Sequence, residues 1–105
     1  MSFNKNIENF SKYYLYKTKN IKDLENALND PSIFAKLYIS TNPICPNYIL
    51  IELFKKEKIT LIQFGILSNP NLDFKSLKII HSYCLNEEIK KTLYLNPNWI
   101  LNDFA

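Results

Sequence analysis

This chain of 105 residues contains a single glycine, Gly65, and no arginine. A single glycine cannot supply the positive-φ positions of many β-turns, which excludes a β-rich fold, and it leaves no glycine-rich phosphate loop. Without arginine, the chain lacks the residue that makes most of the bidentate contacts by which proteins read guanine. The net charge of +3 excludes an acidic DNA mimic and falls short of a strongly basic nucleic-acid binder.

Signals for metal binding, secretion and membrane insertion are missing as well. The two cysteines, Cys45 and Cys84, and the one histidine, His81, lack the spacing of metal ligands, so we expect no metal and no other cofactor. Residues 1–5 lack the apolar run of a signal peptide, and no segment reaches the ~20 apolar residues that span a bilayer. These features predict a cytoplasmic protein with reduced thiols and no membrane partner.

What the sequence does contain is a repeat. The dipeptide Asn-Pro occurs three times at a constant interval of 27 residues, in Asn42-Pro43, Asn69-Pro70 and Asn96-Pro97. A period of this length is typical of proteins whose units stack on their neighbours and share a core. Proline disfavours the α conformation in the residue before it, so a helix should end at each of these corners. The asparagine side chain is expected to bond nearby backbone groups that the helix end leaves unpaired.

The two complete units, 42–68 and 69–95, match apolar residue to apolar residue. The aligned pairs are Leu50 with Leu77, Leu53 with Ile80, Ile62 with Ile89, and Ile66 with Leu93. Spacings of three and four residues predict helices. We place them near 5–18, 21–29, 31–40, 46–56, 58–68, 73–84, 86–95 and from about 98.

Helix starts are marked by residues that cap a helix N-terminus. Asn20, Asp30, Asp73 and Asn86 are the expected N-caps, with Pro31 and Pro46 in the first turns of their helices. Glu87 and Glu88 suit the positive end of a helix better than the acidic pair of a catalytic site. The expected organisation is one domain over 1–105, with a capping helix (1–19), repeats 20–41, 42–68 and 69–95, and a truncated unit (96–105).

The pattern Asp30-Pro31-x-x-x-Ala35-x-x-Tyr38-Ile39-Ser40-Thr41-Asn42-Pro43-x-x-Pro46 recurs in part at 66–73 and 93–98. It resembles the bacterial leucine-rich repeat variant, a HEAT-like two-helix repeat, over about residues 20–105. The resemblance implies an all-α, right-handed two-helix-repeat solenoid of about seven to eight short helices that binds proteins or ligands. The family's usual unit is slightly shorter, its valine-arginine pair is absent here, and the cysteine cluster of its iron–sulfur module has no counterpart.

The sequence contains one candidate pair of catalytic residues. Cys84 lies one helical turn after His81, so a contact between the thiol and the imidazole is geometrically possible. No other motif supports a reaction. We therefore interpret His81 as a helix-surface histidine, Cys84 as a buried thiol that packs like a small hydrophobe, and the chain as a protein without enzymatic activity.

The abundance of tyrosine favours protein binding, because tyrosine supplies contact area at low entropic cost. The predicted protein-binding residues are Tyr13, Tyr16, Trp99 and Phe104, with Tyr16 and Trp99 expected to be the most exposed. A composition rich in asparagine, isoleucine, lysine and tyrosine is typical of AT-rich genomes. The leading hypothesis is thus a protein-interaction module, acting as an inhibitor, immunity factor or adaptor in a phage, mobile element or virus.

A nucleic-acid contact along a lysine-lined groove is the alternative. The seven lysines that would hold a phosphate backbone are Lys55, Lys56, Lys58, Lys75, Lys78, Lys90 and Lys91. The competing interpretation of residues 55–58 is a solvated loop between helices. Because the last unit is short, we also expect Trp99, Ile100, Leu101 and Phe104 to be poorly covered, which predicts a monomer or a weak homodimer formed through the C-terminal end.

Overall fold

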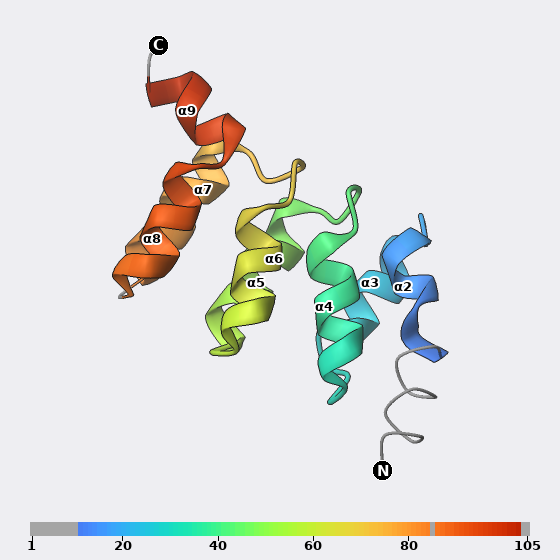
Figure 1. Ribbon diagram of the computed structural model, residues 1–105. Helices are drawn as coiled ribbons and strands as arrows, with labels where there is room; N and C mark the ends of the chain where they lie inside the picture. Colours follow the sequence, from blue (N-terminus) through green and yellow to red (C-terminus); the bar gives the residue numbers. More distant parts are fainter. Residues whose placement is uncertain (1–10, 85, 104–105) are drawn as a thin grey trace.

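The computed structural model describes residues 11–84 and 86–103, and these residues form eight helices and no β-strand (Figure 1). In chain order the helices are α2 (Tyr14–Lys17), α3 (Ile21–Ala27), α4 (Ile33–Thr41), α5 (Asn47–Lys56), α6 (Thr60–Leu67), α7 (Phe74–Tyr83), α8 (Glu87–Tyr94) and α9 (Pro97–Asp103). The all-α prediction is confirmed, and from α3 onward the predicted helix bounds agree to within about two residues. Of the predicted first helix, residues 5–10 lie outside the described residues.

The helices alternate between two rows. In one row α2 packs against α4, α4 against α6 and α6 against α8; in the other, α5 packs against α7 and α7 against α9. Contacts between consecutive helices join the two rows. The colours of Figure 1 therefore run in sequence order along the molecule, whose extents are 47, 28 and 18 Å.

The shared core lies between the rows. All eight residues of the aligned apolar pairs are buried, from Leu50 and Leu77 to Ile66 and Leu93, so this part of the repeat alignment is confirmed. Burying a side chain of this size contributes about 1.5–3 kcal/mol relative to leaving it exposed. The core residues of each unit thus supply most of the energy that holds the rows together.

Most of the predicted helix caps are present. Asn20 accepts a bond from the N–H of Lys22, Asp73 from that of Ser76, and Asn86 from two N–H groups at the start of α8. The prediction for α4 is wrong by two residues. Its N-cap is Ser32, whose Oγ accepts from the N–H of Ala35, while Asp30 Oδ1 accepts from the N–H of Ser32.

Proline also takes a slightly different place from the one predicted. Pro46 precedes α5 as its N-cap residue, with extended backbone (φ −62°, ψ 150°), whereas Pro97 is the first residue of α9. The fixed φ of proline suits both positions, because an N-cap and the residue after it share similar φ values.

Three buried asparagines form a ladder that connects successive units. Asn42, Asn69 and Asn96 are only 1%, 1% and 3% exposed. Each Oδ1 accepts a bond from the backbone N–H two residues later, at 2.8–3.0 Å. Each Nδ2 donates to carbonyl oxygens 24 to 29 residues earlier in the chain: Asn42 to Leu15 and Thr18 (2.8 and 3.0 Å), Asn69 to Ser40 and Asn42 (2.8 and 2.9 Å), and Asn96 to Leu67 (2.7 Å).

This asparagine ladder gives the Asn-Pro period its physical meaning. The side chains do bond backbone groups near helix ends, as predicted, but the carbonyls that they reach lie 24 to 29 residues earlier in the chain. A second row of amides runs beside the first, with Asn71 Nδ2 donating to Cys45 O (2.7 Å) and Asn98 Nδ2 to Leu72 O (2.8 Å). Every corner is therefore fastened to the preceding corner.

The single glycine sits where two helices approach most closely. Gly65 lies in α6 against α4, and a Cβ atom built on it would be 2.5 Å from the Oγ of Ser40. Ser40 is fully buried and donates to Leu37 O at 2.6 Å. Since no described residue has a positive φ, the absence of a side chain, and not backbone freedom, is what this position requires.

The prediction of a solvated loop over 55–58 is wrong for Glu57. Its side chain is 11% exposed, and its Oε1 lies 2.6 Å from Nζ of Lys36 in α4. Lys55 and Lys56 belong to the last turn of α5, where positive charge complements the helix dipole. The α5–α6 connection is thus tied to the neighbouring helix of the preceding unit by an ion pair.

Replacing Glu57 by glutamine is expected to lower the free energy of unfolding by about 1 kcal/mol, because Lys36 keeps a polar partner but loses the opposite charge. Urea denaturation measures the change. Glu52→Gln is the matched control, since its ion pair with Lys55 is open to solvent on both sides and should cost less than about 0.5 kcal/mol. Equal effects of the two substitutions would contradict the assignment of Glu57 as a tie between units.

None of the helices in the described part of the chain combines the length and the apolar character needed to cross a membrane.

Candidate functional site

The tyrosines predicted to bind protein gather on α2. Tyr13 and Tyr16 stack with ring centroids 6.0 Å apart, and Tyr13 meets the ring of Tyr38 edge-on at 5.5 Å. The ammonium of Lys17 lies 5.7 Å from the centre of the Tyr13 ring. Tyr13 remains 45% exposed and Tyr16 38% exposed. The structure therefore brings these two predicted residues together on an accessible surface, in contact with α4.

Trp99 is not the exposed residue that the sequence predicted. It is half-buried in an aromatic cluster with Phe74, His81 and Tyr94, whose ring centroids lie 5.2–5.7 Å from its own. The cause is the packing of α9 against α7 and α8. Leu101, two residues after Trp99 on α9, is 69% exposed, in line with the expected poor cover of this end. Phe104, the fourth predicted residue, lies outside the described residues.

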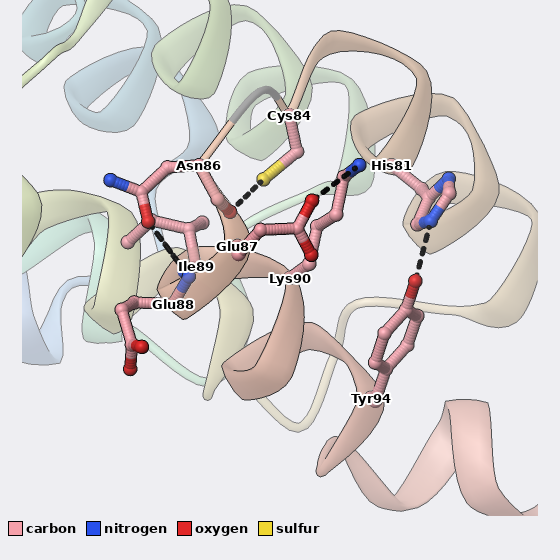
Figure 2. A network of polar contacts seen from close by, with 8 residues as sticks. All are labelled: His81, Cys84, Asn86, Glu87, Glu88, Ile89, Lys90 and Tyr94. Carbon is pink, nitrogen blue, oxygen red and sulfur yellow. Dashed lines mark hydrogen bonds and ion pairs between the residues drawn. The ribbon is translucent and has the colours of Figure 1, made fainter.

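The side chains of His81 and Cys84 form hydrogen bonds with different residues. Nε2 of His81 lies 2.9 Å from the hydroxyl of Tyr94, whereas the thiol of Cys84 donates to the carbonyl of Asn86 at 3.6 Å (Figure 2). Burial raises the pKa of the Cys84 thiol, and it raises the pKa of Cys45 to about 12. A raised pKa disfavours the thiolate that a nucleophile requires. The arrangement agrees with the packing interpretation of Cys84, and Cys45 is likewise free and buried.

The seven lysines of the nucleic-acid alternative lie in three places. Lys90 and Lys91 on α8 pair with Glu87 and Glu88 at 3.5 and 3.4 Å; Figure 2 shows the first of these pairs. Lys75 and Lys78 are exposed on α7. Lys55, Lys56 and Lys58 lie at the α5–α6 connection, where Lys55 pairs with Glu52 and Lys56 donates to Asn29.

An apolar surface that the sequence analysis missed covers two neighbouring helices. Its five residues, which we call the apolar face, are Ile33, Phe34 and Leu37 of α4 and Leu61 and Phe64 of α6. Ile33 is 51% and Leu61 59% exposed, and the other three are half-buried. By helical periodicity they lie away from Ala35, Ile39, Ile62 and Ile66, which face the core, although Phe64 also packs partly against the core.

The repeat period would have revealed this surface. Phe34 and Leu61 are 27 residues apart, as are Leu37 and Phe64, so both pairs occupy equivalent outward positions of adjacent units. One period later the same two positions hold Glu88 and Lys91, which form an ion pair on α8. An alignment that compares only the core positions does not include these outward positions. Residues at outward positions depend on what the surface binds and not on how the chain folds.

The chain has no significant match among protein-family models, curated proteins or solved structures. Its function must therefore be argued from its own geometry.

Proposed function

We propose that this protein is a HEAT-like, right-handed solenoid of two-helix repeats that serves as a non-enzymatic protein-interaction module. The two alternating rows of helices and the asparagine ladder support the solenoid, because both recur with the 27-residue period. In this proposal the module acts in the cytoplasm as an inhibitor, immunity factor or adaptor. The tyrosine-rich surface of α2 extends the binding surface beside α4.

The apolar face is the observation that carries the proposal. A water-soluble surface normally places charged or polar residues at outward helix positions, as α8 does with Glu88 and Lys91. On α4 and α6 the equivalent positions hold phenylalanine and leucine, of which Leu61 is strongly exposed, and the exposed Ile33 precedes Phe34 on α4. Adjacent exposed apolar side chains on neighbouring helices are typical of a surface that a partner protein covers.

Capture of the tagged protein from its native host, with a nuclease-treated control, tests the proposal. We expect one stoichiometric protein that survives nuclease treatment. Calorimetry with that purified partner should then show that Leu61→Glu weakens binding at least tenfold, because a buried contact at the centre of an interface is lost. Leu101→Glu is the matched control, since Leu101 is similarly exposed on α9, and it should bind as the unchanged protein does.

Other results would redirect or reject the proposal. If Leu101→Glu and not Leu61→Glu abolishes binding, the C-terminal end is the interface, and sedimentation of the variant would show whether that end also pairs two copies. Partners lost on nuclease treatment would favour the seven-lysine alternative, whose affinity should fall steeply with salt. The competing proposal is the weaker one, because Lys90 and Lys91 already have acidic partners.

A further inference from the structure

A pocket of about 350 Å³ opens between the α5–α6 connection and the α7–α8 connection. Phe54, Cys84 and Ile89 give it a buried apolar floor. Its polar walls are formed by Lys55, Lys58, Thr60, Gln63, Tyr83 and Asn86. Figure 2 shows three of these lining residues, Cys84 after the end of α7, Asn86 before α8 and Ile89 in its first turn. A volume of this size, with an apolar floor and a few converging polar groups, suits a small organic ligand.

Comparison with the preceding repeat shows that this pocket lacks an ion pair. One period earlier, the equivalent positions hold Lys36 and Glu57, whose ion pair at 2.6 Å fills the space between α4 and the α5–α6 connection. In the next unit these positions are Gln63 and Cys84, so the carboxylate is gone and the lysine has become an amide. No residue lining the pocket is acidic.

Two lysines, Lys55 and Lys58, line this pocket without an acidic residue beside them in the lining. Lys58 makes no hydrogen bond or ion pair within the described residues. Lys55 lies 4.9 Å from the centre of the Tyr83 ring and 3.5 Å from Glu52. The hydroxyl of Tyr83 raises the pKa of Lys55 above its ordinary value, so the ammonium is the form present at neutral pH. Glu87, at the start of α8, is paired with Lys90.

We propose that this pocket binds an organic carboxylate, with the carboxylate group between Lys55 and Lys58 and an apolar body over Phe54 and Ile89. Lysine–carboxylate contact is the pairing that the chain itself uses at two preceding positions, Lys36–Glu57 and Lys12–Asp30. The hydroxyl of Thr60 adds a donor on the same wall. The Gln63 amide already donates through Nε2 to Glu57 O at 2.9 Å, which leaves one further N–H for a ligand. The inference goes beyond the protein-interaction proposal and does not depend on it.

Titration of the ¹⁵N-labelled protein with hexanoate tests the pocket, and hexan-1-ol is the uncharged control. We expect saturable shifts of the amide signals of Lys58, Thr60, Asn86 and Ile89 with hexanoate, and at least tenfold weaker binding of hexan-1-ol. Inorganic phosphate should shift these signals only weakly, because it has no apolar body for the floor of the pocket. Equal binding of the alcohol, or tighter binding of phosphate, would overturn the proposal.

Variants locate the carboxylate. The double substitution Gln63→Lys with Cys84→Glu restores the ion pair of the preceding unit, and it should abolish hexanoate binding. Lys58→Gln should weaken binding about three- to tenfold through loss of one charged contact, whereas Lys75→Gln on α7 should leave it unchanged. Lys58 is exposed, so its variant reports on the site even if the double variant does not fold. Binding that survives Lys58→Gln unchanged contradicts the assignment.

A second titration in the same experiment distinguishes the two possible sources of the carboxylate, a partner protein and a free organic acid. N-acetyl-phenylalanyl-glutamic acid amide presents a glutamate side chain as a partner protein would, and hexanoate presents a free acid. Tighter binding of the peptide identifies a glutamate of a partner protein as the natural occupant, and tighter binding of hexanoate identifies a free organic acid. Failure of both probes rejects the carboxylate site and leaves the apolar face of α4 and α6 untouched as an interaction surface.

Discussion

Asn69→Ala is expected to lower the free energy of unfolding by about 2–4 kcal/mol. The substitution removes three hydrogen bonds from a side chain that is 1% exposed. The carbonyl of Ser40 is then left buried without the amide that satisfies it, and an unsatisfied buried polar group costs about 1–3 kcal/mol by itself. Urea denaturation followed by circular dichroism measures the loss.

Asn26→Ala provides the matched control for Asn69. Asn26 is an exposed residue of α3, and alanine is the better helix former, so this variant should be neutral or more stable by a few tenths of a kcal/mol. If Asn69→Ala costs no more than Asn26→Ala, the amide ladder does not fasten the units to one another. Asn42→Ala should resemble Asn69→Ala, because its amide also donates to two carbonyls earlier in the chain, those of Leu15 and Thr18.

Gly65→Ala should destabilise the protein by about 2 kcal/mol, although alanine favours a helix over glycine by about 1 kcal/mol. The added Cβ would lie 2.5 Å from Ser40 Oγ and 3.3 Å from Thr41 Cγ2, so α4 and α6 must separate or Ser40 must give up its bond to Leu37. Overpacking of this kind costs about 1–3 kcal/mol. Thermal and urea unfolding of the variant measure the net effect.

A double-mutant cycle separates the close contact from other consequences of the added methyl group. In a Ser40→Ala background the nearest remaining atoms to the Cβ lie at 3.3 and 3.4 Å, which is tight but tolerable. The cost of Gly65→Ala should therefore fall to below about 0.5 kcal/mol, a coupling of the size seen between residues in contact. Undiminished destabilisation in that background would show that the Ser40 hydroxyl is not the obstacle.

Helix positions could be predicted well from this sequence because local and periodic signals agreed. Asn-Pro ended α4, α6 and α8 where proline geometry requires it, and Asp73 and Asn86 capped α7 and α8 through bonds to the next few residues. Asp30 was misassigned as a cap because Ser32, two residues on, competes for the same role with its own short side chain.

Long-range partners could not be predicted in the same way. Glu57 looked like part of a solvated run of lysines, since nothing local indicates that Lys36 lies across a helix–helix contact. Trp99 looked exposed because the packing of α9 onto Phe74 and His81 depends on the angle of the preceding corner. Both errors concern contacts between units, which a single period of the sequence does not encode.

The asparagine ladder has a direction. At every rung the donor amide belongs to the later unit and the accepting carbonyl to the earlier one. A chain emerges from the ribosome N-terminus first, so each new corner meets acceptors that are already in place. Loss of a later unit leaves only carbonyls unpaired, and an orphaned carbonyl is better tolerated than an orphaned N–H donor. The direction of the ladder thus agrees with the direction of synthesis, because each unit adds donors to acceptors that are already folded. A nascent chain that ends at a corner leaves no buried side-chain amide without an acceptor.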